Sequence, residues 1–307
     1  MSKVVECVPN ISEGCNKKIV EQIVDTVRNT RDVKLADYSS DANHNRSVIT
    51  FFGSPEAVEE SVVKLACKAV ELIDLTKHSG EHPKMGAVDV IPFIPVKNMT
   101  MDETVILSKK VAERIWSEAK LPVYLYEFSA GKPYRTRLED IRRGGFTGMF
   151  EKVIQDGWEP DFGGCTVHPT AGVCAVGARN PLVAFNINLS TSDISIANSI
   201  AKTIRKSSGG FDGVKAIGIF LEDRNIAQVS INFTDLDATP VHVVVDAVRD
   251  EAQKHGTEIA GTELIGLAPV KTFIDCAKHY LKLENFDREK QIIENHLSND
   301  PQIRSLY

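Results

Sequence analysis

The chain has 307 residues, of which 42% are hydrophobic and 25% are charged. At about 150 residues per domain this length favours two domains, and the composition excludes a disordered or fibrous protein. The 36 basic and 42 acidic residues give a net charge of −6, with both signs spread along the chain. This balance argues against a general binder of nucleic acids or anionic membranes, because such binding depends mainly on positive charge facing phosphates.

Neither a targeting segment nor a membrane span is predicted. The N-terminal sequence MSKVVECVPNISEG has no long apolar stretch, and no apolar run approaches the roughly 20 residues that a membrane helix needs. The cysteines are dispersed without a C-x-x-C pair, which is typical of reduced thiols in the cytosol. They are Cys7, Cys15, Cys67, Cys165, Cys174 and Cys276. We therefore expect a soluble cytoplasmic protein.

Hydrophobic periodicity and capping residues predict alternating strands and helices in the first half. Strands are predicted at residues 4–8, 33–37, 47–52, 87–96 and 123–128. Helices are predicted after Asn16, Ser54 and Thr100, each of which can cap a helix N-terminus. Pro55 suits the first helical position, and Glu103 completes a capping box with Thr100. One apolar stripe marks the second helix, formed by Val58, Val62, Leu65, Ala66, Ala69, Leu72 and Ile73.

The second half repeats this rhythm. Strands are predicted at residues 182–189, 214–221 and 226–233, with helices at 192–206 and from Thr239-Pro240 to Gly256. Both halves read β-α-β-β-α-β, the ferredoxin-like order, in which an antiparallel sheet carries helices on one face. The predicted fold class is α+β, with two such subdomains whose mixed or antiparallel sheets face each other across a ligand groove.

A domain boundary is predicted at the polar triplet Arg179-Asn180-Pro181, which separates two apolar segments. The N-terminal subdomain then covers residues 1–179 and the C-terminal subdomain residues 180–307. From residue 283 onward the sequence is charged and only weakly apolar, which indicates a helical C-terminal tail.

The densest cluster of reactive side chains is the segment KHSGEHPKMG at residues 77–86. Its two glycines and one proline prevent a regular helix, so two histidines, a glutamate and two lysines lie on a loop. Such a loop between rigid elements fits a functional site. The alternative interpretation is an exposed polar loop that caps the preceding helix. His78 and His82 have the spacing of a zinc pair, but that spacing converges on a metal only within a helix, so no metal is predicted.

A second unusual segment, DFGGCTVHPTAG, occupies residues 161–172. Paired glycines let a backbone approach a ligand closely, and free N–H groups and hydroxyls can bind a heteroaromatic ring or an anion. An interdomain linker rich in turn residues is the alternative interpretation. The small, apolar residues 171–177 disfavour that alternative, because they indicate packing.

Arginines of the first half indicate a small polyanionic substrate, because guanidinium groups pair with carboxylates through two hydrogen bonds. Arg46 precedes a strand, and the others cluster after the last strand of that half: Arg135, Arg137, Arg142 and Arg143. For any one of them, a solvated surface role is the alternative.

Two strands of the second half carry polar residues on one face. Asn186 and Asn188 alternate with apolar residues on one strand, and Gln228 with Asn232 on another. This pattern fits a sheet surface that lines a cleft, and a solvent-facing sheet would give the same pattern.

Several stretches together resemble the glutamate formiminotransferase family, the folate-dependent enzymes of histidine breakdown. They cover both halves in order. They are VECVPNISEG (5–14), NRSVITF (45–51), HSGEHPKMGAVDVIPFIPV (78–96), PVYLYE (122–127), WEPDFG (158–163), GARNPLVAFNINL (177–189) and AQVSINF (227–233).

This resemblance implies transfer of the formimino group from N-formimino-L-glutamate to N5 of tetrahydrofolate. It makes His82 the catalytic acid/base, and it assigns folate binding to the loop after the DFG triplet, to which we add Asn186 and Asn188. The loop residues are Gly163, Gly164, Cys165, Thr166, Val167, His168, Pro169, Thr170, Ala171 and Gly172. Their sequence departs from the vertebrate pattern, and His168 has no assigned role. For the substrate carboxylates we expect Arg46, Lys84 and Arg135 as partners.

Tetrahydrofolate is thus the expected co-substrate and formiminoglutamate the expected donor, in a homodimer that binds no metal, nucleic acid or membrane. Three other functions remain open at this stage. They are formyl transfer from N-formylglutamate, non-catalytic folate binding, and RNA binding by paired ferredoxin-like domains. The net negative charge and the lack of an RNA-binding strand motif disfavour the last.

Overall fold

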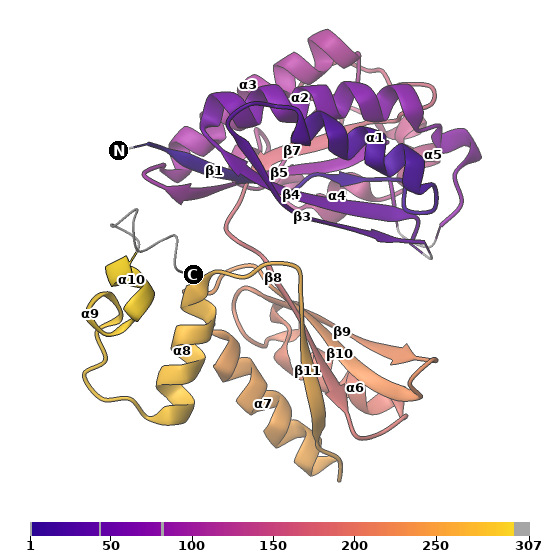
Figure 1. Cartoon of the computed structure of the whole chain (residues 1–307). Helices are drawn as coiled ribbons and strands as arrows, with labels where there is room; N and C mark the ends of the chain where they lie inside the picture. Colours follow the sequence, from indigo (N-terminus) through magenta and orange to yellow (C-terminus); the bar gives the residue numbers. More distant parts are fainter. Residues whose placement is uncertain (1, 43, 81–82, 298–307) are drawn as a thin grey trace. The chain divides into compact units, whose positions relative to one another are not determined.

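A computed structural model describes residues 2–42, 44–80 and 83–297 (Figure 1). The chain separates into two compact units, Met1–Asn180 and Pro181–Tyr307. Among the described residues, no helix is long and apolar enough to cross a membrane.

The first unit contains one sheet and five α-helices in its described part. Its strands are β1 (Val4–Cys7), β2 (Asn10–Ile11), β3 (Val33–Asp41), β4 (Arg46–Gly53), β5 (Val88–Lys97), β6 (Val123–Leu125) and β7 (Cys174–Ala178). Its helices are α1 (Lys17–Arg28), α2 (Pro55–Leu72), α3 (Met101–Ala119), α4 (Leu138–Arg142) and α5 (Gly145–Lys152).

The predicted helix starts are confirmed. The Asn16 side chain accepts a hydrogen bond from the first turn of α1, and the Ser54 side chain accepts one from Ala57 N at the start of α2. Thr100 and Glu103 form the reciprocal capping box of α3. These contacts satisfy backbone N–H groups that a helix leaves free at its N-terminus.

The first sheet is mixed, which the prediction of mixed or antiparallel sheets allowed, and with seven strands it is larger than the predicted ferredoxin-like sheet. Strands β3, β4, β1 and β5 pair antiparallel in that order, with β2 also between β4 and β5. Strand β7 then pairs parallel with both β5 and β6. All five residues of β7 are buried, so the segment lacks the alternation that marks a half-exposed strand. The predicted strand at 123–128 ends at Leu125, because a 3-10 turn begins at Glu127, where φ is +51°.

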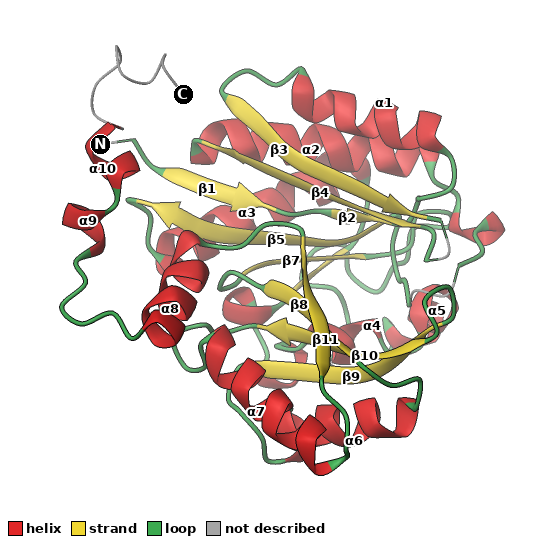
Figure 2. Cartoon of the chain, turned by 60° about the horizontal axis from the view of Figure 1, so that its bottom comes forward, coloured by secondary structure: helices red, strands yellow, loops and turns green. Residues whose placement is uncertain are grey.

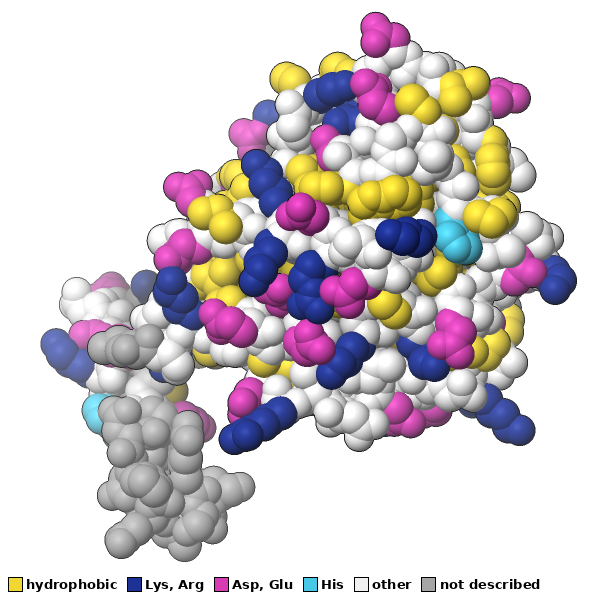
Figure 3. Space-filling view, turned by 90° about the horizontal axis from the view of Figure 1, so that it is seen from above, with side chains coloured by type: hydrophobic (Ala, Val, Ile, Leu, Met, Phe, Trp, Pro, Cys, Tyr) yellow, Lys and Arg dark blue, Asp and Glu magenta, His cyan; other side chains and the backbone are white. Residues whose placement is uncertain are grey.

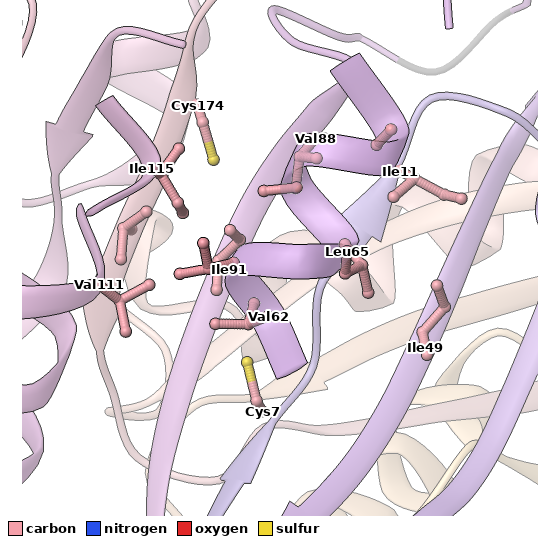
Figure 4. Close-up of a cluster of buried hydrophobic side chains, with 14 of the residues drawn as sticks. Cys7, Ile11, Ile49, Val62, Leu65, Val88, Ile91, Val111, Ile115 and Cys174 are labelled. Carbon is pink, nitrogen blue, oxygen red and sulfur yellow. The ribbon is translucent and has the colours of Figure 1, made fainter. Parts of the chain in front are cut away.

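One face of this sheet packs against α1, α2 and α3 (Figure 1). The core between them includes the predicted α2 residues Val62 and Leu65, both fully buried, together with Cys7, Ile91 and Ile115 (Figure 4). The apolar stripe predicted for α2 is therefore confirmed as its core-facing side.

For the first unit, the prediction that helices cover only one face of the sheet is wrong. A second, smaller core lies on the other face of β5, β6 and β7, where Ile141 of α4 and Met149 of α5 pack against Val90, Tyr124 and Ala175. This region is rich in arginine, so its few apolar residues give no clear helical pattern in the sequence. Two glycines with positive φ, Gly144 before α5 and Gly145 at its first position, let the chain turn sharply between the two short helices.

The second unit forms a four-stranded antiparallel sheet with the order β11-β8-β10-β9 (Figure 2). Its elements are β8 (Val183–Leu189), α6 (Ile194–Ile204), β9 (Val214–Leu221), β10 (Ile226–Phe233), α7 (Val241–Lys254), β11 (Ile259–Ile265), α8 (Val270–Leu281), α9 (Arg288–Gln291) and α10 (Ile293–Leu297). Strand β11 supplies the last strand of the β-α-β-β-α-β order, which periodicity alone did not locate. Helices α6 and α7 pack on the apolar face, which includes Ile187 and Val229.

On the face seen in Figure 3, basic and acidic side chains are interspersed and form no large patch of one sign. This distribution agrees with the spread of charges along the sequence.

Candidate active site

The two segments singled out as functional lie side by side in the first unit. Gly86 and Gly172 form an antiparallel bridge. Ala87 N donates to Ala171 O at 2.8 Å, and Val173 N donates to Met85 O at 3.0 Å. Residues 85–87 and 171–173, far apart in the sequence, are therefore joined by one antiparallel bridge and its flanking hydrogen bonds.

Glycine is required at this junction. Gly172 has a φ of +73°, and a Cβ there would lie 2.0 Å from Met85 O. A Cβ on Gly86 would lie 2.0 Å from Val173 O. The two backbones approach closely because neither residue has a side chain.

His168 closes the predicted folate loop at its C-terminal end. Its backbone exchanges two hydrogen bonds of 2.9 Å with Gly172, and its ring Nδ1 accepts one from Ala171 N at 3.0 Å. Burial lowers the pKa of the His168 imidazole, in keeping with a neutral ring whose Nδ1 accepts. The half-buried histidine thus has a structural role in shaping the turn, which the sequence did not reveal.

The remaining loop residues divide by exposure. Gly163, with a φ of +115°, lies against Pro122, and Thr166 Oγ1 donates to Gly163 O at 2.7 Å. The backbone of Gly164, Cys165 and Thr166 forms the exposed tip, while Ala171 and Gly172 are buried. The exposed, positive-φ glycine backbone at the tip is the part of this loop most open to a ligand.

Glu81 and His82, the predicted acid/base, lie outside the described residues. The residues on either side of them are described and define the surroundings of the site. His78 Nε2 donates to Asn45 O at 3.1 Å. Its Nδ1 is buried and has no hydrogen-bond partner among the residues that the structure describes. Burial and the nearby Lys84 ammonium lower the pKa of His78, partly offset by backbone hydrogen bonding to Asn45.

Asn45 connects three of the segments that carry the family resemblance. Its Oδ1 accepts from Gly14 N at 2.8 Å, and its Nδ2 donates to Ser79 O at 2.8 Å. Nearby, Ser12 Oγ donates to Gly86 O at 2.7 Å. The stretches beginning at residues 5, 45 and 78 thus converge on one loop. Sequence reasoning missed Asn45, and its position in a polar turn, where asparagine tolerates left-handed φ, was the available signal.

Asp89 is a second functional candidate that sequence reasoning missed. Its side chain is 1% exposed, and its two oxygens accept from Met85 N at 2.8 Å and from Arg142 Nη2 at 2.5 Å. The signal was a lone carboxylate inside the apolar strand VDVIPFIPV, since a buried charge needs a partner.

The predicted carboxylate-binding residues occupy different environments. Burial lowers the pKa of Arg46 and of Lys84, and in both cases Asp89 acts in the opposite direction. Lys84 belongs to the loop at 77–86, where its Nζ lies 3.5 Å from Gly80 O, and Arg46 is the first residue of β4.

Arg135 is held inside the first unit. Its side chain is 1% exposed, and its guanidinium donates to Asp161 Oδ1 at 2.7 Å and to Glu159 O at 2.6 Å. It also stacks 5.4 Å from the centre of the Tyr124 ring. These contacts hold Nη1 and Nη2 inside the protein, whereas Nε is buried and has no partner among the described residues. We therefore expect a structural role for Arg135, and its role at the donor carboxylates stays a prediction.

In the second unit, the predicted polar residues lie on the sheet face opposite the apolar core. Gln228 Nε2 donates to Asn188 Oδ1 at 2.8 Å, and both side chains are buried. Asn186 Nδ2 lies 3.4 Å from Glu263 Oε2 on β11. Two of the predicted amides, Asn188 and Gln228, are thus joined across β8 and β10, and Asn186 lies beside a carboxylate of β11.

Cys7 and Cys174 are poor candidates for a catalytic nucleophile. Burial raises the pKa values of Cys7 and Cys174 well above the usual thiol range, so neither forms a thiolate readily. No group of three metal-ligating side chains occurs within residues 2–42, 44–80 and 83–297.

Comparison with known families identifies both units. Residues 4–179 match the formiminotransferase domain, N-terminal subdomain, and residues 184–299 match the formiminotransferase domain. The chain therefore belongs to the formiminotransferase family, which confirms the resemblance seen in the sequence.

Individual relatives agree with this assignment. The chain is 51% identical to glutamate formimidoyltransferase of Streptococcus pyogenes serotype M1, over 97% of this chain and 99% of that protein. It is 41% identical to glutamate formimidoyltransferase of Thermoplasma acidophilum, over 94% of this chain and 96% of that one. It is 42% identical to formimidoyltransferase-cyclodeaminase of Rattus norvegicus, over 95% of this chain but 54% of that protein. The chain thus spans about half the length of the rat relative.

Proposed function

We propose that this protein is a glutamate formimidoyltransferase, which moves the formimino group of N-formimino-L-glutamate to N5 of tetrahydrofolate. The observation that carries the proposal is the identity of 51% with an enzyme of that name, over nearly the full length of both proteins. The segment at residues 78–96, with its paired histidines, is intact.

The proposed chemistry is an acyl-type transfer between two nitrogens. N5 of tetrahydrofolate attacks the amidine carbon and loses its proton, and the bond from that carbon to the glutamate nitrogen breaks. The leaving nitrogen needs a proton as it departs. A single histidine can accept the first proton and donate it in the second step, because its ordinary pKa of about 6.5 allows both near neutrality. We assign this role to His82.

For folate we propose the exposed tip of the loop at residues 163–172 together with Asn186 and Asn188 of β8. Positive-φ glycines leave N–H groups available at the tip, and the amides on β8 offer donors and acceptors to a pterin. The proposed subdomains are residues 1–179 and 180–307. Arg46 and Lys84 are the proposed partners of the donor carboxylates.

One assay tests the proposal directly. Purified protein is mixed with tetrahydrofolate and either N-formimino- or N-formyl-L-glutamate, and free glutamate is measured. We expect release from the formimino donor. Release only from the formyl donor would reassign the substrate, and folate binding without any release would reduce the protein to a folate-binding role.

We also propose that the enzyme acts as a cytoplasmic homodimer and needs no metal. Sedimentation analysis of the purified protein tests the dimer. Full activity after treatment with EDTA is the expected result for the metal.

A further inference from the structure

The loop at residues 77–86, which carries the proposed acid/base, is tied to the rest of the first unit at its C-terminal end. Met85 N donates to Asp89 Oδ1 at 2.8 Å, and Gly86 forms a bridge with Gly172. A catalytic group needs neighbours that hold it in its reactive geometry, so the way in which the N-terminal end of this loop is held also matters.

Asn45 holds the N-terminal end of the loop. Its side-chain Nδ2 donates to Ser79 O at 2.8 Å, and its backbone O accepts from His78 Nε2 at 3.1 Å. Gly80 packs so closely on the same residue that a Cβ on Gly80 would lie 2.8 Å from Asn45 Cβ. Three consecutive residues of the loop therefore contact Asn45, and Gly80 precedes His82 by two positions in the sequence.

Asn45 is itself fixed in place. Its Oδ1 accepts from Gly14 N at 2.8 Å and from Cys15 N at 3.2 Å, and its backbone has a left-handed φ of +48°. An amide side chain supplies both the acceptor and the donor that this arrangement needs, and asparagine tolerates that φ better than most residues. Among the described residues, Asn45 provides the one side chain outside the loop that hydrogen-bonds to residues 78–80.

We propose that Asn45 is a positioning residue, which orients the loop so that its histidine acid/base reaches the reacting nitrogens. The protein engages both the oxygen and the nitrogen of the Asn45 side chain, so Asn45 acts through the loop and not by contact with substrate. This inference rests on the proposed function and adds to it a residue outside the loop on which turnover depends. Displacing a catalytic group by about 1 Å can lower a rate by about 10²-fold.

Kinetics of an isosteric variant test the proposal. Asn45→Asp keeps the acceptor for Gly14 N and Cys15 N but places an oxygen against Ser79 O, so that repulsion replaces the hydrogen bond. We expect kcat to fall by about 10- to 100-fold, with the KM values for both substrates within about twofold, because the loss falls on the transition state.

Two further variants control for charge and for residue type. Asn45→Gly fits the φ of +48° and adds no charge, so it should show the same loss of kcat. Asn98→Asp is the matched control, since Asn98 also has a left-handed φ, +51°, and its Nδ2 donates to a backbone carbonyl, Ser2 O, at 3.1 Å. It should leave kcat and both KM values unchanged.

A double-mutant cycle separates positioning from a general structural effect. If Asn45 acts through the acid/base, Asn45→Asp should lower kcat by less than about threefold in the His82→Ala background, where no imidazole remains to be positioned. A merely structural role would give the same loss of about 10- to 100-fold in both backgrounds, and that result would overturn the proposal.

Hydrogen exchange measures the loop without relying on activity. The peptide covering residues 74–80 should exchange faster in Asn45→Asp than in the unaltered protein, whereas peptides from β5 and α3 should exchange at the same rate in both. Equal exchange of residues 74–80 in the two proteins would show that Asn45 does not hold the loop. Faster exchange throughout the first unit in both Asn45 variants would assign Asn45 a structural role and also overturn the proposal.

Activity of the unaltered protein separates this inference from the proposed function. Absence of transfer by the unaltered protein would refute the proposed function, and this inference with it. Transfer with an unchanged kcat in Asn45→Asp, or a loss confined to one KM, would refute the positioning role and leave the proposed function standing.

Discussion

Arg135→Met distinguishes a structural arginine from a substrate-binding one. The change removes the hydrogen bonds of the guanidinium to Glu159 O and Asp161 Oδ1, which measure 2.6 and 2.7 Å, and its stacking on Tyr124. Asp161 keeps only its bond from Leu125 N at 2.8 Å and becomes an uncompensated charge with 16% exposure. Breaking a buried ion pair from one side costs about 3–5 kcal/mol, so the free energy of unfolding of the first unit should fall by that amount.

Tryptophan fluorescence in urea measures this loss selectively. The chain has two tryptophans, Trp116 and Trp158, and both belong to the first unit. With a denaturant slope of about 2.5 kcal/mol per molar, the midpoint should move down by roughly 1–2 M. Arg137→Met is the matched control. Arg137 is 64% exposed, with carboxylate partners 3.8 Å away, and its loss should shift the midpoint little.

Activity per folded molecule completes the test. Below the unfolding transition, the Arg135 variant should keep the KM of the unaltered protein for the formimino donor. An unchanged urea midpoint, or a donor KM raised about tenfold or more, would refute the structural assignment.

Four further outcomes are expected. His82→Ala should lower turnover by ~10²–10⁴ and remove a limb near neutrality from the pH–rate profile, with folate affinity measured by titration nearly unchanged. Leu65→Ala, at a fully buried position, should cost about 2–4 kcal/mol in urea unfolding with normal activity per folded molecule. Gly172→Ala should destabilise the first unit and weaken folate binding, because its Cβ would meet Met85 O at 2.0 Å. Burial lowers the pKa of His168 in the folded protein, so the stability it contributes is present above its unfolded pKa of about 6.5 and is lost as pH falls. Urea midpoints at pH 7.5 and 5 should differ less in His168→Asn.

Local rules were sufficient for much of the fold. Caps at Asn16, Ser54 and Thr100 set the helix starts, because each satisfies backbone donors within its own first turn. The apolar residues of α2 recur with the 3.6-residue period of a helix, and this spacing identifies the buried face of α2. Such features depend on neighbours within a few residues, so the sequence contains the whole signal.

Features that depend on distant partners were not predictable in this way. Strand β7 is buried on both faces, so its sequence CAVGA shows no alternation, and it is recognisable only once β5 and β6 lie on either side of it. Helices α4 and α5 are short and bury few residues each, and the chain around them is mostly polar. Their place on the sheet follows from the second core, whose members come from five different segments.

The four clustered arginines show why residue type alone cannot assign a site. Their side chains are chemically identical, so the sequence alone predicts one anion-binding group formed by Arg135, Arg137, Arg142 and Arg143. In the folded chain each takes the carboxylate within its reach: Arg135 pairs with buried Asp161, Arg142 with buried Asp89, and the other two with exposed partners on α4. Arg135 and Arg142 share a further feature, because the Nε of each is buried and has no partner among the described residues. Tertiary pairing with carboxylates 26 and 53 residues away therefore separates the two arginines held inside the first unit from the two exposed ones.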